Sequence, residues 1–451
     1  MGKPGFCCIT FGCQMNVNDS LWVERALAAR GFESRAMENA DVILVNTCSV
    51  REKPEQKVYS TLGRISMLNP HAVVGVAGCV AQQIGSEIAR RYPQVRLVAG
   101  SDGIASVPDA FERLLEDPAL RLSYLDFTDA FPDRDPFLAK GSKPEASPVA
   151  FVNIMQGCDN FCAYCIVPFT RGPRKSRSAQ AVLEECRQWV QLGAGDITLL
   201  GQNVNAFGKD KLGDGTSFPQ LLRMVAAIPG LRRIRFVSAH PKDISDETIA
   251  LFAELPQLCP RLHLPLQSGS TSMLRKMGRG YTMERYLSVV EALRAARPDL
   301  ALSTDLIVGF PSETEQEFED TLKSIDSCGF MSSFSFCYSD RPGTRASAMP
   351  FKIPREIQLE RLSRLQALQN ERAEEWLRTR VGMMTDVLLE GPSQRQEGGN
   401  FWQGRDTWGD VVNVSLPQGQ GRPGLFVDVR VQAAKKHSLL ADRKSTRLNS
   451  S

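Results

Sequence analysis

Residues 155–165, with the sequence MQGCDNFCAYC, decide how the rest of the chain is interpreted. Cys158, Cys162 and Cys165 form a C-x3-C-x2-C pattern in this stretch. Cysteine thiolates are the standard ligands of iron-sulfur clusters, and a 4Fe-4S cluster usually takes four of them. Three ligands leave one iron open, and an open position distinguishes a reactive metal site from a structural one. A zinc site with a fourth ligand from elsewhere is the alternative, although none of the four histidines lies near this loop.

The segments around this loop alternate between strand and helix patterns. Residues 149–156 (VAFVNIMQ) are apolar and β-branched, which predicts a buried strand. Similar runs at residues 197–204, 233–240, 261–269, 302–310 and 332–339 are separated by helical segments. This alternation predicts a parallel sheet, as a barrel or a doubly wound sheet. In a barrel, reactive groups collect at the C-terminal ends of strands. Polar residues lie at or near those ends: Gln202, Asn203, Asn205, Ser238, His240, Gln267, Ser268 and Asp305.

The cysteine pattern, with Tyr164 directly before the last cysteine, opens this six-strand β/α pattern and resembles the radical S-adenosylmethionine superfamily. The resemblance implies a partial (β/α)6 barrel over residues 149–380 and a 4Fe-4S cluster on Cys158, Cys162 and Cys165. In that superfamily the open iron binds S-adenosylmethionine, which is cleaved to a 5'-deoxyadenosyl radical. Tyr164 would pack beside the adenine. Strand-end position and resemblance give further candidates for holding S-adenosylmethionine, each of which could equally be a satisfied polar residue: Gln202, Asn203, Ser238, Gln267 and Asp305.

The first part of the chain predicts a separate, doubly wound α/β domain over residues 1–130. Ligands of such a sheet bind beyond the carboxyl ends of its strands. Cys13, Cys48 and Cys79 each follow one of the first three predicted strands, so one sheet edge could bring three thiolates together. Gly12 and Gly78 beside two of them fit tight turns. Three unrelated buried thiols are the alternative, because free cysteine is commonly buried.

Four motifs sharpen the resemblance: FGCQMN, NTCSVREKPEQK, GCVAQ and MQGCDNFCAYCIVPFTRGPRKSR. They are similar to the methylthiotransferases, and most of all to the MiaB-type branch, which converts N6-isopentenyladenosine at position 37 of tRNA into its 2-methylthio derivative. The resemblance implies an auxiliary 4Fe-4S cluster on Cys13, Cys48 and Cys79. One S-adenosylmethionine would methylate a sulfur there, and the radical from another would remove the C2 hydrogen of the adenine. The same chemistry on N6-threonylcarbamoyladenosine of tRNA, or on a ribosomal-protein aspartate, is the alternative.

A tRNA substrate requires positive charge, yet the net charge of +3 is too small to indicate RNA binding by itself. Arg171, Arg174, Lys175 and Arg177 follow the cysteine loop closely, and guanidinium groups suit bidentate phosphate contacts. A solvated basic turn is the alternative. A protein that merely binds RNA, with structural metal centres, is the competing hypothesis for the whole chain.

The C-terminal part predicts a long amphipathic helix over residues 354–380, and then short strands over residues 381–441. These strands predict a small antiparallel β-barrel that resembles the TRAM domain, an RNA-binding module of tRNA-modifying enzymes. Lys435 and Lys436 are candidate RNA-binding residues that would contact phosphates of the tRNA, whose anticodon loop is the expected partner, and a purely structural cap is the alternative.

The remaining segments bear on context. Residues 131–148 contain Pro132, Pro136, Pro144 and Pro148 and predict an extended linker. Residues 442–451 (DRKSTRLNSS) break the pattern, so we expect a disordered or foreign tail. We expect a cytoplasmic protein without membrane contact, because no apolar run could span a bilayer and MGKPGFCC lacks a signal-peptide core. We also expect a monomer. The chemistry needs a reducing electron donor, and the sulfur source stays unknown.

Overall fold

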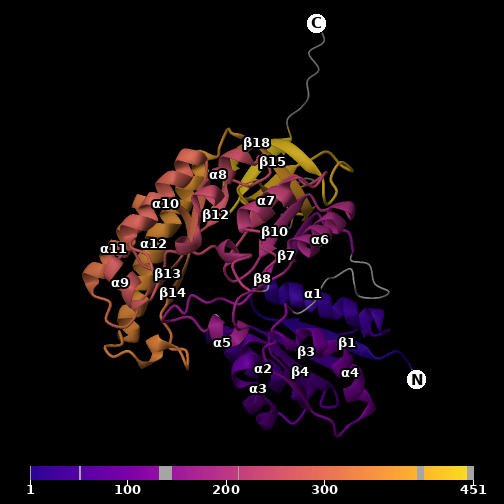
Figure 1. Cartoon of the computed structure of the whole chain (residues 1–451). Coiled ribbons are helices and arrows are strands. Elements are labelled where there is room, and N and C mark those ends of the chain that lie inside the picture. The colour runs from indigo at the N-terminus through magenta and orange to yellow at the C-terminus, as the bar shows by residue number, and fades with distance from the viewer. Residues whose placement is uncertain (1, 50–51, 132–144, 212, 394–400, 444–451) are drawn as a thin grey trace.

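The computed structural model of the chain (Figure 1) describes residues 2–49, 52–131, 145–211, 213–393 and 401–443. An N-terminal α/β unit is followed by a central half-barrel and a C-terminal β-barrel. Figure 1 shows the N-terminal unit and the C-terminal barrel at opposite ends of the half-barrel. Residues 132–144 of the expected linker and residues 444–451 of the expected tail lie outside the described residues. The domain boundaries stay a prediction.

The N-terminal sheet is parallel and has the strand order β2-β1-β3-β4-β5-β6. In β3 (Val42–Thr47), Val42 and Leu44 pack against α1 and α4, whereas Ile43 and Val45 pack against α2 and α3. Because successive strand residues point to opposite faces, both faces are covered and the expected doubly wound fold is confirmed. The other elements are β1 (Gly5–Thr10), α1 (Gln14–Ala29), β2 (Glu33–Ser34), η1 (Met37–Asn39), α2 (Glu52–Leu68), β4 (Val73–Gly78), α3 (Cys79–Arg91), β5 (Val95–Ala99), η2 (Gly103–Ser106), α4 (Val107–Glu116) and β6 (Leu122–Tyr124).

The half-barrel consists of two parallel sheets, ordered β11-β10-β7 and β12-β13-β14. A parallel bridge between Ile234 and Leu258 continues the pairing from β11 toward β12. One buried apolar cluster runs through both sheets and their helices, which confirms the expected partial barrel. Its elements are β7 (Val149–Asn153), α6 (Ala179–Gln191), β10 (Asp196–Leu200), η3 (Val204–Ala206), α7 (Phe218–Ala226), β11 (Arg233–Phe236), η4 (Pro241–Asp243), α8 (Asp246–Glu254), β12 (Arg261–His263), α9 (Thr271–Lys276), α10 (Met283–Ala296), β13 (Ala301–Val308), α11 (Glu315–Cys328), β14 (Phe330–Cys337) and η5 (Arg345–Ala348).

The strand expected over residues 149–156 is divided in two. After β7, the short strand β8 (Met155–Gln156) no longer pairs with β10 and instead pairs antiparallel with β9 (Lys175–Ser176). Between them lie the cysteine loop and α5 (Val167–Arg171). The cysteines therefore lie in the connection between the two strands of a short β-ribbon.

Helix α12 (Arg355–Thr379) joins the half-barrel to the C-terminal barrel, because Leu365 packs in the core of the former and Leu377 in that of the latter. The closed barrel has the order β15-β16-β17-β19-β18, and the pairing of β17 with β19 is parallel, whereas we expected antiparallel strands throughout. β19 also continues to Arg443, two residues into the expected tail. The strands are β15 (Met384–Pro392), β16 (Phe401–Asp406), β17 (Val411–Ser415), β18 (Phe426–Ala434) and β19 (Leu439–Arg443). No helix among the described residues is long and apolar enough to cross a membrane.

Candidate active site

The N-terminal cysteines meet at the carboxyl edge of their sheet. β1 and β3 are neighbours, and the chain leaves them toward opposite ends of the sheet, which makes this the switch point where such sheets bind ligands. Cys13 follows β1 and Cys48 follows β3, while Cys79 opens α3 after β4. At Gly78, φ is +87° and an added Cβ would lie 2.4 Å from the Thr47 carbonyl oxygen, so glycine is required there.

In this site Cys13 contacts Cys48, whereas Cys79 contacts Arg171. A hydrogen bond with Cys48 lowers the pKa of the Cys13 thiol to about 6, and Arg171 and the backbone N–H groups of Met15 and Asn16 act in the same direction against partial desolvation. Arg171 Nε donates to Cys79 Sγ at 3.3 Å. We define Cys13, Cys48 and Cys79 as the auxiliary site.

Cys158, Cys162 and Cys165, defined here as the radical site, are buried to half-buried on the ribbon. Burial raises the pKa of the Cys165 thiol to about 12, and the neighbouring Cys162 adds to this. Two backbone hydrogen bonds fix the loop: Ala163 N–H donates to the Met277 carbonyl, and Ala346 N–H donates to the Ala163 carbonyl, both at 2.8 Å. The ribbon thus presents the thiols in a loop held by distant segments.

A buried arginine also lies beside the radical site. Arg279 Nη1 is 3.5 Å from Cys162 Sγ and 3.3 Å from the Tyr164 hydroxyl, while its Nε donates to the Tyr281 hydroxyl at 3.0 Å. The sequence reasoning missed this residue. The sequence feature that could have indicated Arg279 is the glycine on either side of it, Gly278 and Gly280. Both glycines have positive φ in the structure, so Arg279 lies between two tight turns.

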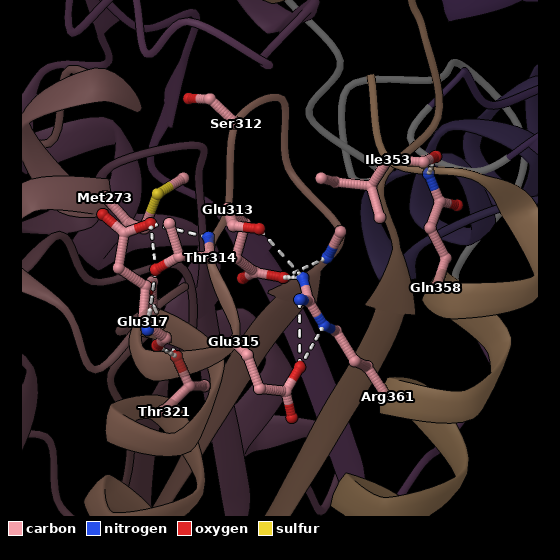
Figure 2. Close-up of polar contacts among 12 residues, drawn as sticks. Met273, Ser312, Glu313, Thr314, Glu315, Glu317, Thr321, Ile353, Gln358 and Arg361 are labelled. Carbon is pink, nitrogen blue, oxygen red and sulfur yellow. Dashed lines mark hydrogen bonds and ion pairs between the residues drawn. The ribbon is translucent and has the colours of Figure 1, made fainter. Parts of the chain in front are cut away.

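The loop after β13 packs beneath the radical site, since Phe310 shares a small apolar cluster with Ala163 and Tyr164. Figure 2 shows how α12 holds this loop: Arg361 lies between Glu313 and Glu315 and pairs with both carboxylates. Burial raises the pKa of Glu313 to about 7, although the Gly309 N–H and Arg361 oppose this.

The donor set of each site suits an iron-sulfur cluster, because it consists of soft thiols with no carboxylate or imidazole ligand between them. No three His, Cys, Asp or Glu side chains in the described ranges stand close enough to hold one metal ion. Thiolates of a 4Fe-4S cluster bind different iron atoms, so they stand farther apart than the ligands of a single ion. Iron would also displace the thiol protons, because metals bind the thiolate form.

The strand ends carry polar atoms that suit a polar cofactor. Asn203 Oδ1, both side-chain polar atoms of Asn205, and His240 Nε2 are buried and have no hydrogen-bond partner within the described part of the chain. Burial, together with Arg279 and Lys242, lowers the pKa of His240 to about 2, so its imidazole is neutral. Unpaired buried polar groups are costly, and a bound S-adenosylmethionine would provide partners for them.

The other predicted S-adenosylmethionine contacts lie around the same opening. Gln202 accepts from Gly157 N–H at 2.6 Å and contacts the Met15 sulfur, so it touches both cysteine-bearing units. Ser238 and Gln267 have positive φ values of +64° and +77°, a strained conformation of the kind that clusters at functional sites. Asp305 Oδ2 lies 3.4 Å from His263 Nε2. The roles of these residues and of Tyr164 stay predictions.

The basic run after the cysteine loop differs from the exposed patch that we expected. Arg171, Lys175 and Arg177 are buried and paired with Asp19, Asp102 and Glu185 respectively. Phosphate contact does not fit these three, because their charges are already used inside the protein. Arg174 is partly exposed and pairs with Asp159. Lys435 and Lys436 are exposed beside a groove of about 220 Å³ that Glu374 and Arg378 also line.

Comparisons with known proteins agree with this architecture. A family model described as "Uncharacterized protein family UPF0004" matches residues 6–100, and the model of the radical SAM superfamily matches residues 152–325. The chain is similar in fold to the radical S-adenosylmethionine methyltransferase TsrM from Kitasatospora setae, with cobalamin and a 4Fe-4S cluster bound. That likeness has a TM-score of 0.55 and 14% identity, and covers 76% of this chain and 74% of that chain.

Curated relatives match nearly the whole chain, and the two described here are both named tRNA-2-methylthio-N(6)-dimethylallyladenosine synthase. The protein from Nitratidesulfovibrio vulgaris (strain Hildenborough) is 58% identical over 438 residues, which cover 96% of this chain and 97% of the relative. The protein from Lawsonia intracellularis is 54% identical over 453 residues, which cover 98% and 99%. Identity at this level over both chains shows that this chain belongs to the family of tRNA-2-methylthio-N(6)-dimethylallyladenosine synthases.

Proposed function

We propose that the chain methylthiolates N6-dimethylallyladenosine, also called N6-isopentenyladenosine, at C2 of adenine 37 in tRNA. The observation that carries this proposal is the presence of two separate cysteine triplets, the auxiliary site on the N-terminal sheet and the radical site on the ribbon, in units that the buried Arg171–Cys79 and Lys175–Asp102 contacts join. The names of the relatives support the substrate. When bound, the two 4Fe-4S clusters and S-adenosylmethionine supply the electron, the radical and the methylated sulfur.

The residues of the chain orient these groups and keep water away. Cys158, Cys162 and Cys165 would hold the cluster that takes S-adenosylmethionine, and Cys13, Cys48 and Cys79 would hold the second one. S-adenosylmethionine would be bound by Tyr164 of the cysteine loop, by Asp305 within β13, and by the residues that follow β10, β11 and β12, namely Gln202, Asn203, Ser238 and Gln267.

The target base must leave the anticodon-loop stack to reach a buried site, as enzymes that act on bases generally require. Arg174, Lys435 and Lys436 are the candidate phosphate contacts, because their side chains are at least partly exposed. An external reductant must return to the cluster the electron that the cluster supplies. We propose that the chain works as a monomer in the cytoplasm, where tRNA is modified.

Anaerobic reconstitution tests the division of labour. The wild-type chain should bind two clusters and form both 5'-deoxyadenosine and the methylthiolated nucleoside from unmodified tRNA. Cys79→Ala should stop methylthiolation while 5'-deoxyadenosine still forms, and Cys162→Ala should stop both. Absence of 5'-deoxyadenosine from the fully loaded wild-type chain would favour a protein that merely binds RNA. Product on a threonylcarbamoyl substrate instead would change the substrate but not the chemistry.

A further inference from the structure

Arg171 crosses from one cysteine-bearing unit into the other. It ends α5, which directly follows the radical-site loop and lies against α3 of the N-terminal unit (Figure 1). Its guanidinium nevertheless lies inside the auxiliary site. Nε donates to Cys79 Sγ at 3.3 Å, Nη2 donates to Asn16 Oδ1 at 3.1 Å, and Nη1 pairs with Asp19 Oδ2 at 3.4 Å.

This guanidinium is deeply buried, with 2% of the residue exposed, and its partner Asp19 is 1% exposed. A buried charge is tolerated when its surroundings neutralise it and satisfy its hydrogen bonds. An arginine guanidinium is not deprotonated in proteins, and here it pairs with the buried Asp19 carboxylate at 3.4 Å, so the group stays charged. A permanent cation therefore touches one thiol of the auxiliary site and lies near another.

We propose that Arg171 is a positioning residue of the auxiliary centre, through which the radical half of the chain sets both the reduction potential and the placement of the second cluster. The inference rests on the proposed binding of that cluster by Cys13, Cys48 and Cys79. Hydrogen bonds to ligand sulfurs and nearby charge control the reduction potential of iron-sulfur clusters. A cation stabilises the more negative, reduced form, so loss of Arg171 makes the auxiliary cluster harder to reduce.

Arg279 gives the comparison at the radical site. It also approaches a cysteine sulfur, that of Cys162, but its other bonds go to the Pro265 carbonyl and the Tyr281 hydroxyl of the same half-barrel. Arg171 differs because it is anchored in one unit and bonded in the other. It fixes the auxiliary site relative to the loop that carries the radical site.

The test isolates the auxiliary cluster in a chain whose Cys158, Cys162 and Cys165 are all replaced by alanine. The midpoint potential of the remaining cluster is then measured by potentiometric EPR in the parent, Arg171→Gln and Arg171→Lys. Arg361→Gln is the matched control, because it also removes a buried guanidinium from ion pairs, far in sequence from every cysteine of the auxiliary site (Figure 2).

We expect Arg171→Gln to change the reduction equilibrium at least tenfold toward the oxidised form, about 59 mV for a one-electron couple. Arg171→Lys should shift it less, and Arg361→Gln should leave it unchanged. In the otherwise wild-type chain, Arg171→Gln should lower the ratio of methylthiolated nucleoside to 5'-deoxyadenosine at least tenfold. Loss of the cluster from both Arg171 variants, with retention in Arg361→Gln, would support the positioning role.

An unchanged potential and an unchanged product ratio in a fully loaded Arg171→Gln would overturn the inference while leaving the proposed function intact. If Arg171→Gln is unstable because the Asp19 carboxylate loses its ion pair with Arg171, the double variant Arg171→Gln/Asp19→Asn removes that buried charge and gives the same comparison. Absence of any cluster from the parent would instead contradict the second cluster itself, and the inference with it.

Discussion

The contact between the N-terminal unit and the β8–β9 ribbon should depend most on Asp102. This residue follows β5 of the N-terminal sheet, and its carboxylate accepts hydrogen bonds from Lys175 Nζ and Gln156 Nε2 of the β8–β9 ribbon. It also accepts from the backbone N–H of Thr128 at 2.8 Å. The Asp102 and Lys175 side chains are 1% and 2% exposed. Asp102→Ala therefore leaves a buried ammonium group without a counter-ion.

Breaking a buried pair from one side costs about 3–5 kcal/mol, a large part of a typical domain stability of about 5–15 kcal/mol. Because every 1.4 kcal/mol is a factor of ten, the lower value corresponds to roughly a hundredfold faster opening of the ribbon. Hydrogen exchange followed by mass spectrometry measures this locally and does not require the whole chain to unfold in one step. The expected result is roughly hundredfold faster exchange in β8 and β9 of Asp102→Ala, while α10 and α11 stay unchanged.

The double variant Asp102→Ala/Lys175→Met provides the internal control. Removing both charges leaves no stranded ion, so most of the lost protection should return. Asp102→Ala should also form 5'-deoxyadenosine with less methylthiolated product, because the two sites are no longer held together. Unchanged exchange in the ribbon, or a double variant as unprotected as the single one, would refute this reasoning.

Three further predictions concern pH, domain docking and the auxiliary turn. The pKa of Glu313 in the folded chain is about 7, above its ordinary value of 4.5. Between these two pH values the folded chain therefore holds a proton that the unfolded chain has released. The stability that Glu313 contributes is complete below about pH 4.5 and is lost as the pH rises through about 7. Urea unfolding at several pH values should show a smaller loss of stability over this range in Glu313→Gln, and an unchanged pH dependence would contradict the assignment. Trp408 is 8% exposed, and its indole N–H donates to the Asp299 carbonyl at 2.8 Å. Trp408→Ala should therefore lower the free energy of unfolding by about 3–5 kcal/mol and make the C-terminal barrel susceptible to limited proteolysis. Phe351 is exposed, so Phe351→Ala should change neither the stability nor the proteolysis. Gly78→Ala should displace Cys79, because the added Cβ would clash with the Thr47 carbonyl oxygen. Iron analysis should then find an iron content close to that of one cluster. An iron content equal to that of the wild-type chain would show that the turn can adapt.

The sequence predicted what depends on local pattern. Cys13 and Cys48 could be placed at one sheet edge because each follows an apolar strand, and parallel strands end together. The half-barrel was predictable for the same reason, from strands alternating with helices. β8 was not, since a two-residue strand has too little pattern to separate it from β7.

The basic run shows the limit of such reasoning. Arg171, Lys175 and Arg177 look like a solvated or RNA-binding patch because neighbouring charges in a sequence carry no sign of burial. Their structure depends on acids far along the chain: Asp19 is 152 positions from Arg171, and Asp102 is 73 positions from Lys175. Pairings over such separations are fixed by tertiary packing, so no local pattern reveals them.

The central claim is that two cysteine sites cooperate to insert a methylated sulfur into tRNA. Mass spectrometry of tRNA nucleosides tests it most directly, in a bacterial strain that lacks its own methylthiotransferase and expresses either the wild-type chain or Cys79→Ala. The account predicts 2-methylthio-N6-isopentenyladenosine with the wild-type chain, and its unmodified precursor alone with Cys79→Ala. Persistence of the precursor with a cluster-loaded wild-type chain, or full product with Cys79→Ala, would contradict it.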